Sequence, residues 1–279
     1  MISDRNIPDF AVIGAMKAGT TTLYHYLLAH PDVGMSRMKE TDYFIDSANH
    51  SLGRKWYLSQ FEPGKKIYGE VSPNYTKHDI FPRVPQNLAA SSPDARLIFL
   101  ARDPVARFAS HYVHAWQLGH MDVAPEEILD TKNGQHMLET SRYAAQMDTY
   151  LQVFDRAQIL MLDFDQLRTE PQAVMDQVCA HIGVDSIPVA DIGAQNDAGS
   201  IARMPRGVQR LWRSKAGRML DPLISREMRD FGRRMLARGK ARVPPKLNDD
   251  ILAQAGAALR ADADRFREMS GLPFDQWPV

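Results

Sequence analysis

Residues 10–23 read Phe10-Ala-Val-Ile-Gly14-Ala-Met-Lys17-Ala-Gly19-Thr20-Thr21-Thr22-Leu23. The run over 10–14 is apolar and predicts a short buried strand, and the apolar spacing after Gly19 predicts a helix over 20–29. In the turn between them, glycines allow close backbone approach, a lysine adds positive charge and threonines add hydroxyl donors. Because N–H groups at a helix start attract anions, the stretch predicts an anion-binding loop.

This loop is similar to a phosphate-binding P-loop but departs from the usual pattern, which ends in Gly-Lys-Ser/Thr. Here Gly19 is followed by Thr20, and Lys17 lies two residues before that glycine. A glycine- and threonine-rich turn alone would be as consistent with a structural turn. Its position between a strand and a helix favours an anion site.

A second signal lies in Leu97-Ile-Phe-Leu-Ala-Arg102-Asp-Pro-Val-Ala-Arg-Phe-Ala-Ser110. We expect a buried strand over 96–101 and a helix from Pro104, a residue suited to a first helical turn. Arg102 would then lie at the carboxyl end of a strand, where open parallel sheets bind ligands. Its planar guanidinium suits phosphate, with pairing to Asp103 as the alternative.

The remaining pattern alternates apolar strands with helices, which favours a parallel sheet covered on both faces. We therefore predict an α/β, P-loop-like three-layer fold with a central, mostly parallel sheet flanked by helices. Residues 1–279 are expected to form one domain. Further predicted strands cover 67–71 and 158–162, and further predicted helices cover 141–154, 172–182 and 248–269.

The composition excludes a disordered chain, because 44% of the residues are hydrophobic and 24% are charged. No apolar run approaches the roughly 18 residues that a membrane helix needs, and the first residues do not have the pattern of a signal peptide. A single cysteine, Cys179, permits no disulfide within the chain and no cysteine-based zinc site. We expect a cytoplasmic protein.

The 34 basic and 34 acidic residues balance, but unevenly along the chain. Residues 201–245 contain 13 Lys/Arg and 3 Asp/Glu, a local charge of +10. This segment is predicted to form a basic helical cap. Its arginines either pair with the acidic remainder of the chain or attract an anionic acceptor.

Together, the two anion-binding segments resemble the superfamily of sulfotransferases that use 3′-phosphoadenosine 5′-phosphosulfate (PAPS). In that family, Lys-x-Gly-Thr-Thr holds the 5′-phosphosulfate and Arg-Asp-Pro…Ser holds the 3′-phosphate. Ser200-Ile-Ala-Arg203 resembles, in part, a loop that closes over the nucleotide. The resemblance implies these PAPS-binding residues: Lys17, Ala18, Gly19, Thr20, Thr21, Thr22, Arg102, Ser110 and Arg203.

Four further motifs come in the order seen in heparan-sulfate-type and related bacterial sulfotransferases. They are His30-Pro-Asp-Val33, Lys39-Glu-Thr-Asp-Tyr-Phe44, Trp56-Tyr57 and Gly69-Glu-Val-Ser-Pro-Asn-Tyr75. The relatives often carry a histidine where Asp42 stands and a lysine where Val71 stands, so the acceptor cannot be carried over from them.

The resemblance implies an in-line displacement that depends on positioning and charge stabilisation. Glu40 matches the general base of the heparan-type enzymes, with Glu70 as the second candidate. Lys17 would stabilise charge on the leaving oxygen, and His114 would assist near the sulfuryl group. Alternatively, Glu40 is a surface residue paired with a neighbouring cation, and His114 is structural.

We expect a carbohydrate, lipid or small-molecule acceptor with a hydroxyl or amine, and neither a metal nor a nucleic acid. Two alternatives remain. A P-loop kinase would need Mg²⁺ and an acidic residue at a strand end, for which Asp103 and Asp163 are the candidates. A non-enzymatic module would bind anions through residues 201–245. The oligomeric state is left open.

Overall fold

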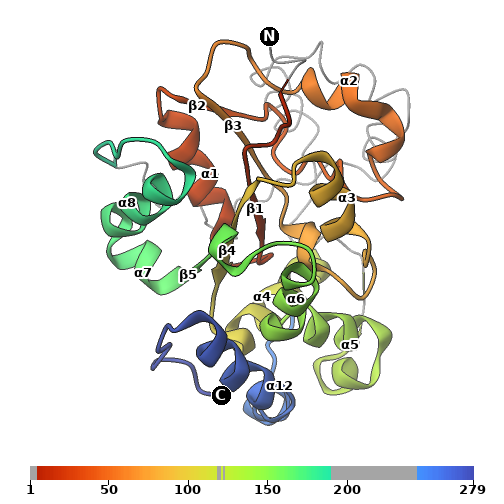
Figure 1. Cartoon of the computed structure of the whole chain (residues 1–279). Coiled ribbons are helices and arrows are strands. Elements are labelled where there is room, and N and C mark those ends of the chain that lie inside the picture. The colour runs from red at the N-terminus through yellow and green to blue at the C-terminus, as the bar shows by residue number, and fades with distance from the viewer. Residues whose placement is uncertain (1–4, 118–120, 122, 190–243) are drawn as a thin grey trace, which may run out of the picture.

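The computed structural model describes residues 5–117, 121, 123–189 and 244–279. A five-stranded sheet lies at its centre (Figure 1), with the strand order β2-β3-β1-β4-β5 and every neighbouring pair parallel. The strands are β1 (Phe10–Gly14), β2 (Val33–Met35), β3 (Ile67–Val71), β4 (Arg96–Ala101) and β5 (Ile159–Asp163). The predicted α/β fold with a parallel sheet is confirmed.

Helices cover both faces of this sheet. The α-helices in the described residues are α1 (Thr20–Ala29), α2 (Gly53–Leu58), α3 (Val84–Ser91), α4 (Pro104–Gln117), α5 (Lys132–Glu139), α6 (Tyr143–Leu151), α7 (Phe164–Thr169), α8 (Pro171–Ile182) and α12 (Asp249–Ser270). Short 3₁₀ helices are η2 (His50–Leu52), η3 (Pro73–Thr76), η4 (Pro125–Asp130) and η5 (Arg156–Gln158).

Side chains point alternately to the two faces of the sheet along each strand, so there is one hydrophobic core on each face. Phe10 and Val12 of β1 pack with α1 and α8, whereas Ala11 and Ile13 face the opposite side, with α3, α6 and α12. Successive side chains of a strand point to opposite faces, so a fully apolar strand is the sequence of a doubly covered sheet. A third cluster joins α4, α5 and α12 through residues such as Phe108.

The C-terminal helix belongs to the same body. Asp262 of α12 accepts hydrogen bonds from the backbone N–H groups of Ala144 and Ala145, at 3.0 and 2.9 Å. This carboxylate therefore caps α6, which starts at Tyr143 rather than at the predicted residue 141. After α12, the rings of Phe274 and Trp277 stack on each other, with centroids 4.0 Å apart.

The expected bounds of the first strand and helix agree with β1 and α1, and α4 begins at Pro104 as expected. The sequence pattern did not predict β2, α2, α3, α5 and α7, all of them short. The prediction of one domain over 1–279 stays a prediction, and most of the basic cap at 201–245 lies outside the described residues. Within the described part of the chain, no helix combines the length and apolarity that crossing a bilayer would demand.

Gly19 is expected to be irreplaceable. Its φ is +86°, and an added Cβ would lie 2.7 Å from the ring of Phe164. Gly183, at the end of α8, has a similar φ of +77°, but an added Cβ there would meet no described atom within 4 Å. Gly183→Ala should therefore lower the free energy of unfolding by about 1–2 kcal/mol, the cost of a left-handed backbone conformation for a residue with a Cβ. Gly19→Ala should lower it clearly more. Urea unfolding of both variants tests this, and equal costs would contradict it.

Candidate active site

The anion-binding loop leaves β1 and enters α1 through two residues with positive φ, Lys17 (+71°) and Gly19 (+86°). The residue before α1 is Gly19, which has no side chain to cap the helix, and the N–H groups at such a helix start attract anions. Thr20, Thr21 and Thr22 form that turn, and Ala18 is buried beneath it. The ring of Phe164 occupies the space beside Gly19, so the loop is fixed in shape.

Arg102 brings the second anion-binding segment to this loop. Its Nη1 donates to the backbone oxygen of Lys17 at 3.2 Å, and its guanidinium lies 5.1 Å from the ring centroid of Phe164. The hydroxyl of Tyr143 donates to the Arg102 carbonyl at 2.8 Å. Two stretches that are 85 residues apart in sequence are thus in direct contact.

Positive charge accumulates around Lys17. Burial lowers the pKa of Lys17, the charge of Arg102 lowers it further, and the charge of Glu40 opposes them. A partly buried ammonium beside a second cation is typical of sites that bind an anion.

The donor set fits the 5′-phosphosulfate and 3′-phosphate of PAPS. The start of a helix, an ammonium and a guanidinium are the groups that bind phosphate and sulfate. A side chain at Gly19 would clash with the ring of Phe164, so the shape of this loop depends on glycine at that position. Ser110, half-buried on α4, follows Arg102 by two helical turns, while Arg203 lies outside the described residues.

The predicted base, Glu40, lies on a segment with an unusual backbone. Its φ is +65° and that of Asp42 is +48°. Such angles are rare for residues other than glycine, and they persist where surrounding contacts impose them, often at functional sites. The N–H of Glu40 donates to the Val71 carbonyl at 2.8 Å, which places the segment beside the end of β3.

The carboxylate of Glu40 is accessible, with 43% of the side chain exposed. Lys39 Nζ lies 2.6 Å from Glu40 Oε1, so the ion pair considered in the sequence analysis is present. Desolvation by the surrounding protein raises the pKa of Glu40. The charge and hydrogen bond of Lys39, together with the charges of Lys77 and His114, have the larger effect, so the pKa is lowered overall. Glu40 therefore lies within electrostatic range of both Lys17 and His114.

Asp42 is a second acidic group at this site. Asn74 Nδ2 donates to both of its oxygens, at 3.2 and 3.1 Å. Burial, with a contribution from the charge of Glu40, raises the pKa of Asp42 to about 7. The sequence marked this position only as a departure from the relatives.

Half-buried Lys77 and fully buried Arg107 are two further cations that sequence reasoning missed. Burial and the charge of Arg107 lower the pKa of Lys77 to about 8, against the opposing charges of Glu40 and Asp42. Arg107 is fully buried, and burial lowers its pKa to about 10. Its neighbour in the motif, Arg102, could have drawn attention to it.

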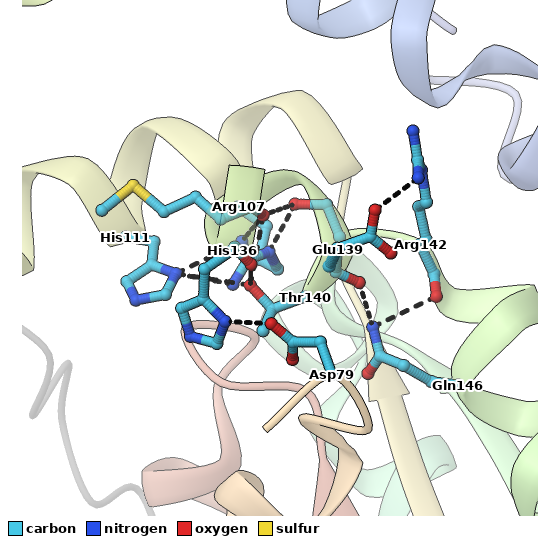
Figure 2. A network of polar contacts seen from close by, with 10 residues as sticks. Asp79, Arg107, His111, His136, Glu139, Thr140, Arg142 and Gln146 are labelled. Carbon is cyan, nitrogen blue, oxygen red and sulfur yellow. Dashed lines mark hydrogen bonds and ion pairs between the residues drawn. The ribbon is translucent and has the colours of Figure 1, made fainter. Parts of the chain in front are cut away.

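Figure 2 shows the network that holds Arg107. Its Nε donates to Ser141 Oγ at 2.7 Å and its Nη2 to the Met137 carbonyl at 2.6 Å. The rings of His111 and His136 lie side by side, with centroids 5.7 Å apart, and His136 Nδ1 contacts Asp79 Oδ2 at 2.5 Å. The network ties α4 and α5 to the segment after β3.

Glu70, the second candidate base, has no exposed surface. Four hydroxyl groups donate to its carboxylate, from Thr41, Tyr57, Ser72 and Tyr75. Burial raises the pKa of Glu70, and these hydrogen bonds oppose the rise. A carboxylate enclosed in this way is not placed to contact an acceptor.

The acidic residues that a kinase would need have other roles here. Asp103 Oδ1 accepts from Val105 N and Asp163 Oδ1 from Asp165 N, each at 2.9 Å, so both cap helices. In the segments that the structure describes, no cluster of three His, Cys, Asp or Glu residues could hold a metal ion.

Comparison with known proteins identifies the family. Residues 7–193 match the family described as "Sulfotransferase domain", so the chain belongs to the sulfotransferases. This confirms the sulfotransferase family predicted from the sequence. A crystal structure of a sulfotransferase from Alicyclobacillus acidocaldarius aligns with a TM-score of 0.70 and 20% identity, covering 98% of this chain and 99% of that one. At this identity, the likeness shows the fold.

Sequence relatives include the bifunctional heparan sulfate N-deacetylase/N-sulfotransferase 4 of Mus musculus, 31% identical over 201 residues, or 64% of this chain. The membrane-associated sulfotransferase kil1 of Dictyostelium discoideum is 38% identical over 111 residues, or 38% of this chain. The matches cover 22% of the length of each of these relatives.

Arg102→Ala is expected to weaken binding of the product nucleotide, 3′-phosphoadenosine 5′-phosphate (PAP), by about 1.5–3 kcal/mol, the scale of hydrogen bonds to charged groups. Arg96→Ala is the matched control, because Arg96 lies exposed at the opposite end of the same strand. Isothermal titration of both variants measures the difference. Equal affinities would remove Arg102 from the nucleotide site.

Asp42→Asn is expected to change stability in a pH-dependent way. The raised pKa means that folded Asp42 retains its proton above the ordinary value of 3.8, so its contribution to stability falls as pH rises from about 4 to 7. The variant should therefore gain stability relative to wild type at pH 8 compared with pH 4. Urea unfolding at both values tests this, with Asp46→Asn as the control in the same segment, and a pH-independent difference would contradict it.

Proposed function

We propose that this chain transfers a sulfuryl group from PAPS to a hydroxyl or amine of an acceptor, with Glu40 as the general base. The observation that carries the proposal is the convergence on Lys17: Arg102 contacts its carbonyl, and the charge of Glu40 acts on its ammonium. An anion-binding loop, a guanidinium and an accessible carboxylate thus meet at one end of the sheet.

PAPS would supply the sulfuryl group and leave as PAP. The first turn of α1 and Lys17 would bind the phosphosulfate, and Arg102 with Ser110 would bind the 3′-phosphate. Lys17 would also stabilise negative charge on the departing oxygen, because its ammonium is held in a partly buried position.

Glu40 would accept the proton of the acceptor during the displacement. Its lowered pKa keeps it ionised near neutral pH, and its exposure leaves it open to an acceptor. Lys39 would orient the carboxylate through Oε1. His114, whose charge acts on Glu40, would assist beside the transferred group.

The acceptor class is a finer proposal. The relatives named as heparan sulfate N-sulfotransferases favour a carbohydrate or small-molecule acceptor with an amine or hydroxyl. Asp42 and Val71 differ from what the relatives often carry, which favours a different acceptor. The role of residues 201–245 at the acceptor cleft and the cytoplasmic location remain predictions.

Glu40→Gln tests the base. The change preserves shape and removes proton acceptance, so turnover should fall by about 10²–10⁴-fold, while PAP affinity changes little. Turnover is measured with radiolabelled PAPS and a panel of amine and hydroxyl acceptors. Glu62→Gln, at an exposed position, is the control for loss of a surface carboxylate. A fully active Glu40→Gln enzyme would refute the assignment.

A further inference from the structure

We infer that Glu70 is a positioning residue: through three hydroxyl groups, it holds residues 40–44 in the conformation that presents Glu40 to the acceptor. The inference rests on the proposed function, in which Glu40 is the base. It gives a role to a buried carboxylate that neither contacts the anion site nor faces solvent.

The carboxylate of Glu70 is saturated with donors. Tyr57 donates at 2.8 Å, Ser72 at 2.9 Å and Tyr75 at 3.0 Å, and Thr41 donates as well. An ionised carboxylate offers about four acceptor sites and no donor. Glu70 therefore orients four hydroxyl protons toward itself at once.

Three of these hydroxyls also accept from the segment that carries the base. Ser72 Oγ accepts from Asp42 N, Tyr75 Oη from Phe44 N, and Thr41 Oγ1 from Tyr43 N, each at 3.3 Å. A hydroxyl has one proton and two lone pairs. Because each proton points to Glu70, the lone pairs are left for the backbone N–H groups.

These links bear on a strained backbone. Glu40 and Asp42 have positive φ, and such angles persist only where the surroundings impose them. The Glu40 N–H is fixed by the carbonyl of Val71, the residue next to Glu70. Asn49 donates to the Thr41 carbonyl and Asn74 to the Asp42 carboxylate. Glu70 and its hydroxyls add three backbone constraints to the same turn, so loss of the Glu70 carboxylate should allow Glu40 to move.

Two tyrosines provide a matched test. Both are buried and both donate to Oε1 of Glu70. Only Tyr75 also accepts from the segment, through Phe44 N. Tyr75→Phe should lower kcat by roughly 10-fold, because small displacements of a catalytic group can cost up to about 10²-fold. Tyr57→Phe should lower it far less, although each variant loses one hydrogen bond to Glu70.

Glu70→Gln extends the test. An amide presents one accepting and one donating end, so two hydroxyls must turn and the links weaken. We expect kcat to fall by about 10–100-fold, with PAP affinity unchanged because the nucleotide loop is separate. Added to Glu40→Gln, the change should cost little more, since Glu70 acts through Glu40.

A measurement that does not depend on activity separates the positioning role of Glu70 from the proposed role of Glu40 as the base. Amide hydrogen exchange at Asp42, Tyr43 and Phe44 should accelerate in Tyr75→Phe and Glu70→Gln, but not in Tyr57→Phe. Equal kcat losses in the two tyrosine variants, additive losses in the double variant, or unchanged exchange would overturn the inference. If Glu70→Gln does not fold, the tyrosine pair decides. An active Glu40→Gln enzyme would refute the proposed base. Amide hydrogen exchange would still show whether Glu70 and its hydroxyl groups hold residues 40–44.

Discussion

Parallel pairing of β1 with β3 on one side and with β4 on the other brings three carboxyl ends to one edge of the sheet. Every described segment of the site depends on this register. The anion-binding loop leaves β1, the segment with Ser72, Asn74 and Lys77 leaves β3, and Arg102 leaves β4. The helices on both faces hold the strands in place through two clusters of hydrophobic side chains.

A consequence of this convergence is unbalanced charge. Lys17, Lys77 and Arg107 all have lowered pKa values, with burial as the largest cause. Assembling buried cations costs free energy in the unliganded protein, and an anionic ligand offsets that cost when it binds. Burial raises the pKa of Glu40, but Lys77, together with Lys39 and His114, lowers it by more and keeps the proposed base ionised. Nucleotide binding and proton acceptance thus share one electrostatic field.

The sequence predicted the parts of this arrangement that depend on local pattern. Apolar runs predicted β1, β4 and β5, a further strand was predicted at the position of β3, and the glycines and threonines around Lys17 predicted the anion-binding loop. It could not predict the shifted pKa of Asp42 or Lys77, because each depends on neighbours from distant segments. Nor could it predict positive φ at Glu40, which contacts with β3 impose on a residue that does not prefer it. The short elements β2 and α7 were missed because too few residues define a period.

Glu40 and Glu70 show why residue type alone does not settle a catalytic role. Both lie in motifs shared with sulfotransferases, and the sequence offered both as bases. Glu40 is exposed and pairs with a lysine, so its charged form is favoured and its carboxylate is accessible. Glu70 is enclosed by hydroxyls that consume its acceptor capacity. A proton acceptor needs an open lone pair next to its substrate, whereas a carboxylate that orders other groups needs all of its lone pairs occupied. The two requirements exclude each other in one side chain, and the fold meets them with two glutamates, Glu40 on the turn at residues 40–44 and Glu70 in the adjacent strand β3.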